Sequence, residues 1–327
     1  MRALLWTTAL AAGLYGGYWF VGSHYALQGA EQALAQLKAD GRADYASVAL
    51  HGFPSRFDLT IDAPRLMSAD GRLRWQAPFL QLLALSYRPN RLIAVWPNDQ
   101  TLTVGPEVLS LHTTDLRGNL NLTASTALAL DSTTLDGKEL VLTREQGGAI
   151  AADRVLLATR AAGSAALHEV ALVITGLSVD ALLRQKIDPA GSLPPMADEA
   201  RFDAVLSFDR PLDRSWAETP AQLTAIHQIT GHFGWGTVQI DLSGDIEIDA
   251  KRDAVGRVIL SARHWRELLA LAVRAGVIAK DQAPRVEALM GSLAQQSGQA
   301  DLLTLPLSLS DGLVHFGPLP LAPLPKF

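Results

Sequence analysis

Two histidines in the second half of the chain are among the side chains best suited to chemistry. His227 and His232 are five residues apart, with Gly231 between them. Imidazole nitrogens are common zinc ligands, but positions i and i+5 of a straight strand point to opposite faces. A shared metal would need a bend or bulge in the strand, so we expect no metal site at this pair.

An acidic cluster follows the histidines closely. It comprises Asp241, Asp245, Glu247 and Asp249. Carboxylate oxygens bind calcium, but a calcium loop adds a glycine-rich turn with ligands at fixed offsets. Here Ile246 and Ile248 alternate with the acids, and this period of two is typical of a strand with one wet face. We therefore expect the acids to lie on the solvent side of a strand.

Known catalytic signatures are missing from the rest of the chain. The other histidines are scattered, and no G-x-S-x-G, H-E-x-x-H, P-loop or S-x-x-K motif is present. The absence of cysteine excludes disulfides, thiolate zinc sites and cysteine nucleophiles. The sequence thus predicts no catalytic, cofactor-binding or metal-ligating residue, no cofactor, and a protein that is not an enzyme. A hydrolase site assembled from distant residues stays open as a third possibility.

Composition narrows the class of protein further. The 327 residues are 48% hydrophobic and 19% charged, which is ample for a sizeable core. The 28 Lys and Arg residues against 33 Asp and Glu give a net charge of -5, and no dense basic run occurs. Electrostatic binding of nucleic acid requires such a basic patch, so we predict no nucleic-acid partner.

The N-terminal segment is uncharged from Ala3 to Ala30. Its most apolar part, Ala3 to Gly22, has the length needed to cross about 30 Å of hydrocarbon as a helix. We predict that it is a transmembrane anchor, with the positively charged N-terminus in the cytoplasm and the rest of the chain outside. A cleaved signal peptide is the alternative, although no clean A-x-A site is present.

Small residues recur every four positions along this segment. Ala9, Gly13 and Gly17 would lie on one face of the helix, where they could let a second membrane helix approach closely. Glycine is also common in membrane helices for other reasons, so this packing face is one of two interpretations.

The remaining chain divides into three parts by pattern. Residues 25–40 place Leu27, Ala30, Leu34 and Leu37 on one stripe and predict an amphipathic stalk helix after the anchor at 1–24. Short alternating segments separated by turn residues then predict a first β-rich half at 41–190. A second β-rich half at 191–327 adds two helices and a C-terminal hairpin. The short connections leave no room for crossover helices, so the pairing should be antiparallel. The predicted fold is mainly β (α+β), a large curved antiparallel sheet with a few covering helices.

Several short motifs along the chain resemble those of a known family. They are Gly52-Phe53-Pro54-Ser55-Arg56-Phe57-Asp58-Leu59, Trp75-Gln76-Ala77-Pro78, Arg88-Pro89-Asn90, Trp96-Pro97, Leu305-Pro306-Leu307, Asp311-Gly312 and Gly317-Pro318. Together with the N-terminal anchor they resemble the domain of unknown function 2125 family of bacterial membrane-anchored proteins, which looks related to the AsmA-like group. The resemblance implies an inner-membrane anchor with the bulk of the chain in the periplasm. It also implies a role in envelope lipid homeostasis or outer-membrane biogenesis, and it supplies no functional residues.

The pattern and the resemblance together favour binding over catalysis. Many alternating strands rich in Leu and Ala create a large one-sided apolar surface, which must be covered by helices, by another sheet or by a ligand. We therefore expect an envelope protein that binds lipid or acyl chains on its sheet. The alternative is a structural or interaction module that docks an envelope protein partner through a strand edge or through the proline-rich tail at 317–327.

Overall fold

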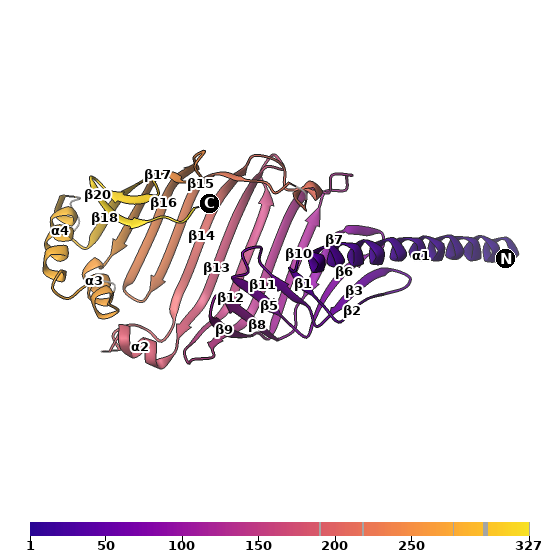
Figure 1. The fold of residues 1–327 in the computed structure, drawn as a ribbon, viewed down its shortest axis with the longest axis horizontal. Coiled ribbons are helices and arrows are strands. Elements are labelled where there is room, and N and C mark those ends of the chain that lie inside the picture. Colours follow the sequence, from indigo (N-terminus) through magenta and orange to yellow (C-terminus); the bar gives the residue numbers. More distant parts are fainter. Residues whose placement is uncertain (190, 218, 277, 297–299, 327) are drawn as a thin grey trace. The chain divides into compact units, whose positions relative to one another are not determined.

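The computed structural model describes residues 1–189, 191–217, 219–276, 278–296 and 300–326. Ala190 and Phe327, the last residues of the two predicted halves, lie outside this range. Within it the chain is mainly β, as predicted, and the strand pairs are antiparallel (Figure 1). The helices are α1 (Arg2–Ala39), α2 (Ala181–Ile187), α3 (Trp265–Arg274) and α4 (Ala283–Gln296), with a 3-10 turn η1 at Arg214–Ala217.

The chain divides into two compact units. Unit 1 comprises Met1–Ala124 and Thr133–Gly147, and unit 2 comprises Ser125–Ser132 and Gly148–Phe327. The sequence instead suggests a division at 190/191. The difference arises because the strand before the proline-containing segment at 188–195 pairs with the strand after it. Leu172 pairs with Phe202 across this segment, so a linker-like composition here joins neighbours of one unit.

Unit 1 contains two rows of antiparallel strands. One row is β2 (Ser47–His51), β3 (Arg56–Asp62), β6 (Phe79–Leu85), β7 (Arg88–Val95) and β10 (Asp115–Leu122), in that order. The other is β1 (Ala43–Asp44), β4 (Arg65–Met67), β5 (Leu73–Gln76), β8 (Asp99–Val104), β9 (Glu107–His112) and β11 (Leu130–Arg144). Helix α1 packs against β1, β2 and β3.

The C-terminal half of α1 packs against the strands of unit 1 along one stripe. Leu27, Ala30, Leu34 and Leu37 are half-buried at helical spacing, which confirms the predicted stripe. The residues between them are exposed, because only one side of the helix faces the strands. The predicted stalk at 25–40 is therefore continuous with the preceding helix and is packed against the sheet.

The segment Ala3 to Gly22 is helical, and its C-terminal turns contact the strands of unit 1. Among the described residues, no helix combines the length and the apolarity that crossing a membrane requires. Trp19 is only 7% exposed, and its indole N–H donates to the Arg56 carbonyl at 2.7 Å. The Tyr18 hydroxyl donates to the Ser86 carbonyl at 2.6 Å. Trp19 and Tyr18 thus attach this helix to the strands of unit 1.

The N-terminal turns of α1 extend past the strands of unit 1 (Figure 1). Nothing lies within 4 Å of the position that a Cβ atom would take on Gly13 or Gly17. Ala9 is exposed as well, so the predicted helix-packing face at Ala9, Gly13 and Gly17 is open. Its use in packing against a second helix stays a prediction.

Unit 2 is built from strands that pair in chain order. They are β12 (Ala149–Ala161), β13 (Leu167–Val179), β14 (Ala197–Phe208), β15 (Leu223–Trp235), β16 (Val238–Ile248), β17 (Ala254–Arg263), β18 (Leu302–Ser310), β19 (Leu313–Phe316) and β20 (Leu319–Pro323). The proline-rich tail thus contributes an edge strand to this unit. Leu324 continues from it and packs beside Val258 and Leu309.

The segment between α2 and β14 is fixed by one buried carboxylate. Burial raises the pKa of Asp188, but hydrogen bonds outweigh burial and hold the pKa below its usual value. The backbone N–H of Leu193 donates to Asp188 at 2.8 Å, and the Ser192 hydroxyl donates to it at 2.7 Å. Leu193 is thereby held in a buried cluster with Val238 and Leu271.

Candidate functional site

One face of the sheet in unit 2 is apolar across seven strands. Strand register places two lines of directly paired residues on this face, which we call the apolar face. The first line is Leu157, Leu172, Phe202, Gly231, Leu242, Leu260 and Leu305, and the second is Val155, Ile174, Ala200, Phe233, Ile240, Ala262 and Leu303. Side chains alternate between faces along a strand, so the residues between these lines point the other way.

The opposite face is polar on β14 to β18 and apolar on β12 and β13. It carries the line Leu156, Val173, Arg201, His232, Asp241, Ser261 and Thr304. Arg201 pairs with Asp203 at 2.6 Å, and the pair is half-exposed. Ion pairs on this side indicate contact with water, so from β14 onward the sheet has one wet face and one apolar face.

Helices cover one end of the apolar face. Trp265 at the start of α3 is 1% exposed and packs with Ala262 and Leu303. Among the described residues of unit 2, α3 packs on β16 and α4 packs on β18, with no comparable helix contact on β12 to β15. On the uncovered strands β12 to β14, Leu157 is 39% exposed, and Leu172 and Phe202 are half-buried. The apolar face therefore continues past the helices that cover it.

The two candidate metal-binding histidines lie on the same face after all. A bulge in β15, between Ile226 and Ile229, supplies the bend that a shared site would need. Each histidine nevertheless has its own acidic partner. His232 Nδ1 lies 2.7 Å from Asp241 Oδ1, and His227 Nδ1 lies 3.6 Å from Asp245 Oδ1. No group of three metal-ligating side chains occurs within the described part of the chain.

The acidic cluster follows β16 and the turn after it. Asp245 and Glu247 are exposed on this strand, as predicted for a wet strand face. Asp249 lies just past the strand, where it accepts the N–H of Asp253 at 2.9 Å. This hydrogen bond lowers the pKa of Asp249. Asp245 and Glu247 both lie beside His227, whereas Asp241 lies beside His232 and Asp249 forms the turn, so the four acids do not converge on one point.

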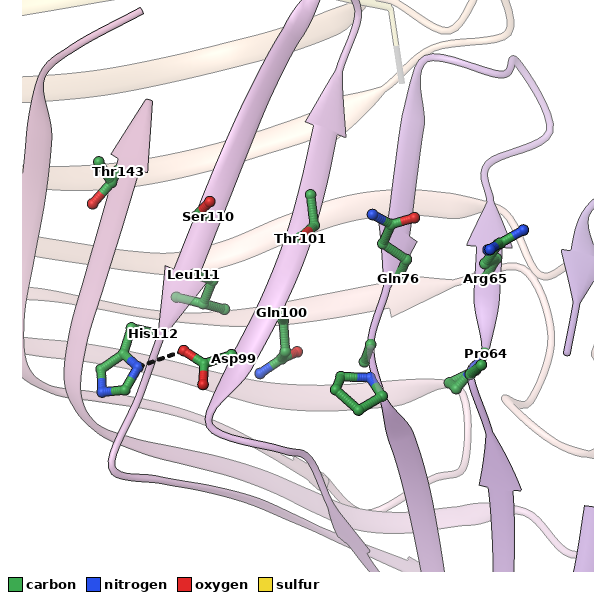
Figure 2. A pocket seen from close by; sticks show the side chains of 13 residues that line it. Pro64, Arg65, Gln76, Asp99, Gln100, Thr101, Ser110, Leu111, His112 and Thr143 are labelled. Atoms are coloured by element: carbon green, nitrogen blue, oxygen red, sulfur yellow. Dashed lines mark hydrogen bonds and ion pairs between the residues drawn. The ribbon is translucent and has the colours of Figure 1, made fainter. Parts of the chain in front are cut away.

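Unit 1 contains a polar cleft of about 510 Å³ (Figure 2). Its floor is a line of polar side chains at directly paired positions on five strands. The line is Arg65, Gln76, Thr101, Ser110 and Thr143. His112 follows Ser110 by two residues on β9, and Asp99 precedes Thr101 by two residues on β8. The Nδ1 atom of His112 lies 2.7 Å from the Oδ1 atom of Asp99. The strand period of two brings all seven side chains to one face.

The polar cleft is suited to binding and is not built as a catalytic triad. Figure 2 shows the Ser110 hydroxyl directed away from the His112 ring, whose hydrogen bond is to Asp99. A nucleophilic serine needs a base within hydrogen-bonding distance. Both members of the His112–Asp99 pair are more than half exposed, so water is not excluded from them.

Two of the motifs quoted above support this cleft. The Trp75 indole N–H donates to Gln100 Oε1 at 2.8 Å, and Gln100 Nε2 donates to the Pro97 carbonyl at 3.1 Å. Gln100 is buried, and this pair of bonds fixes the start of β8 beside Ala77. Sequence reasoning missed the cleft because its polar residues are spread over eighty positions and meet only through register.

Comparison with known proteins gives one match. The family model DUF2125, described as an uncharacterised protein conserved in bacteria, matches residues 19–325. No curated protein and no solved structure matches the chain. The matched segment begins at Trp19, the residue that attaches α1 to the strands of unit 1, and includes every strand of both units. The chain therefore belongs to the DUF2125 family of uncharacterised proteins conserved in bacteria.

Proposed function

We propose that this protein binds lipid acyl chains on the apolar face of unit 2, as a membrane-attached component of the bacterial envelope. The apolar face carries the proposal, because aliphatic and aromatic side chains remain half-exposed on β12 to β14 beyond the helices that cover β16 to β18. Burying apolar surface is favourable by about 25 cal/mol per Å². An acyl chain lying along the strands would gain this energy with no polar group left unpaired.

A purely structural role would use the same surface differently. A partner protein could cover the apolar face, and an edge strand could dock on β20. The tail does not favour this alternative, because it is already paired with β19 and Lys326 binds Asp253 at 2.6 Å. We therefore rank the interaction module second and the hydrolase third.

The test compares two neighbouring leucines of β12. Leu157 lies on the apolar face and Leu156 on the opposite face, so Leu157→Gln and Leu156→Gln are matched variants. With a pyrene-labelled phosphatidylcholine as the probe and the full chain as receptor, Leu157→Gln is expected to weaken binding about tenfold. A tenfold change corresponds to about 1.4 kcal/mol, the scale of one lost leucine contact.

Equal binding by both variants would contradict the proposal. Thermal unfolding of each variant serves as the control for folding. Native mass spectrometry of gently extracted protein provides a second readout. A specific lipid near one-to-one supports the proposal, and recovery of the same bulk lipids as a single-helix control protein counts against it.

Membrane attachment is the second part of the proposal, and it rests on the exposed end of α1. Leu4, Leu5, Trp6, Leu10 and Leu14 are all exposed in the turns before Tyr15 binds the Ser86 hydroxyl at 3.0 Å. Residues 3–14 form about 18 Å of helix, which is roughly half of a hydrocarbon core of about 30 Å. We propose that this end inserts into one leaflet of the inner membrane on its periplasmic side.

Flotation with phosphatidylcholine vesicles tests this attachment. Leu10→Asp is expected to reduce the floated fraction at least tenfold, because a carboxylate is costly to bury in hydrocarbon. Gln28→Asp is the matched control, since Gln28 is an exposed position of the same helix beyond the inserted turns. If Leu10→Asp floated as well as Gln28→Asp, insertion of α1 would be wrong.

A further inference from the structure

Unit 1 also contains an apolar groove, which is lined by arginines and by no acidic residue. It measures about 460 Å³, within the usual size of a small-molecule site. Register places Leu83, Ile93 and Asn119 at directly paired positions on β6, β7 and β10. Arg91 pairs with Asn121 one step along the same face. We call this the arginine groove; its charged residues are Arg56, Arg88 and Arg91.

A proline brings two of these arginines together. Leu85 pairs with Arg88, but the next pair is Ala84 with Leu92, so three residues of β7 have no partner on β6. Pro89 is one of the three and has no N–H to donate to the ladder. A bulge of this kind re-aims side chains, and here it places both Arg88 and Arg91 on the groove.

Two of the three arginines in the groove, Arg88 and Arg91, are not neutralised by the described residues of the protein. Arg56 binds Asp58 at 2.7 Å. Among the described residues, neither Arg88 nor Arg91 forms an ion pair or a side-chain hydrogen bond, and both are exposed. Guanidinium groups bind carboxylate and phosphate in a bidentate manner. Beside them Leu85 and Ile93 are exposed apolar side chains. One rim therefore suits an anion and the floor suits a hydrocarbon chain.

We propose that the arginine groove binds an anionic amphiphile, with its phosphate or carboxylate on Arg88 and Arg91 and its chain on Leu83, Leu85 and Ile93. Charge complementarity selects this occupant, because a neutral or zwitterionic headgroup leaves the guanidinium groups without a net partner. This site lies in unit 1, so it does not depend on lipid binding at the apolar face of unit 2.

Isothermal titration of the full chain with dodecyl phosphate, below its micelle concentration, tests the proposal. Arg88→Gln/Arg91→Gln is expected to weaken binding at least tenfold, and Arg74→Gln, an exposed arginine outside the groove, is expected to leave it unchanged. Ile93→Asn is expected to weaken it about fivefold through the chain contact. All substituted positions are exposed, and melting curves check that each variant is folded.

Three ligand arms identify the headgroup and the site. Inorganic phosphate and dodecylphosphocholine are each expected to bind at least tenfold more weakly than dodecyl phosphate. If inorganic phosphate bound as tightly as dodecyl phosphate, the proposed contact with a hydrocarbon chain would be wrong. If the Arg88→Gln/Arg91→Gln variant bound dodecyl phosphate with unchanged affinity, the proposed arginine site would be wrong. If Leu157→Gln abolished dodecyl phosphate binding while the arginine variant retained it, the ligand would belong to unit 2 and the groove assignment would be wrong.

Discussion

Replacing Trp265 with alanine is expected to lower the free energy of unfolding of unit 2 by about 3 to 5 kcal/mol. Trp265 is 1% exposed and fills the contact between α3 and strands β17 and β18, against Ala262 and Leu303. Its indole N–H donates to the Ala300 carbonyl at 3.0 Å. Alanine would leave a cavity and remove the indole hydrogen bond, so the Ala300 carbonyl would keep only the donor of Arg266 at 3.3 Å, and both effects destabilise the folded state.

Urea unfolding measures this loss, and a second tryptophan of unit 2 supplies the control. Trp216 is 53% exposed, so Trp216→Ala is expected to change the free energy of unfolding by less than about 1 kcal/mol. Trp265→Phe separates the two effects, because it keeps most of the ring contact and loses only the N–H donor. Equal stability of the two alanine variants would show that α3 does not hold the end of the sheet.

The prediction matters for function because Trp265 lies at the covered end of the apolar face. Ala262 and Leu303 belong to one of the two apolar lines that continue along the sheet to Val155. If α3 only covers the end of the apolar face, Trp265→Ala should leave the binding of acyl chains at Leu157 intact. If acyl chains reach as far as α3, the same variant should weaken both stability and lipid binding.

The faces of individual strands could be predicted from sequence, whereas their alignment could not. Alternation around Phe202 and around Ile246 gives the apolar side of each strand correctly. Whether those sides form one continuous face depends on register and on the bulge between Ile226 and Ile229. A one-residue slip reverses a strand's faces. The local pattern does not contain this information. The sequence therefore predicted that a large apolar surface exists, but not which residues of neighbouring strands form it.

The candidate sites of unit 1 were missed for the same reason. Arg88 and Arg91 are ordinary in sequence, and only the bulge at Pro89 places both on the groove with Ile93. The sequence did offer one signal, because Arg88-Pro89-Asn90 is among the motifs that mark the family. A short motif without catalytic residues can thus shape a groove through backbone geometry alone.

The N-terminal helix shows what hydropathy alone does not resolve. Tryptophan and tyrosine combine an apolar ring with a hydrogen-bonding group, so they suit a membrane interface and the edge of a protein core equally. Trp19 and Tyr18 donate to the carbonyls of Arg56 and Ser86. A run of apolar residues cannot distinguish these two environments, because the partner carbonyls lie more than thirty residues away in the chain.

Trp19→Ala is expected to release α1 from unit 1. The ring centroid of Trp19 lies 5.2 Å from that of Phe53 and 6.2 Å from that of Phe57, and the indole donor adds one hydrogen bond. Loss of these contacts is expected to cost about 3 to 5 kcal/mol. Helix α1 also approaches the strands closely at Gly22, where a Cβ atom would come within 2.9 Å of Phe57. The helix therefore depends on a few well-fitted contacts.

Amide hydrogen exchange of residues 15–39 measures this release. Exchange is expected to accelerate at least tenfold in Trp19→Ala and to stay unchanged in Trp6→Ala, since Trp6 is 76% exposed on the same helix. Trp19→Phe should show a smaller effect. If residues 15–39 exchanged equally slowly in the two alanine variants, Trp19 would not be the residue that attaches the helix.

Trp19→Ala and Leu10→Asp together separate two properties of α1. Leu10 lies in the exposed turns, so its variant should lose vesicle binding while α1 remains packed on unit 1. Trp19→Ala leaves residues 3–14 intact and should still float with vesicles. In this variant the strands of unit 1 would be connected to the membrane-bound helix without packing against it. Opposite outcomes for the two variants require that one end of the helix contacts the membrane and the other end holds the protein. A shared outcome would mean that α1 acts as a single structural element of unit 1.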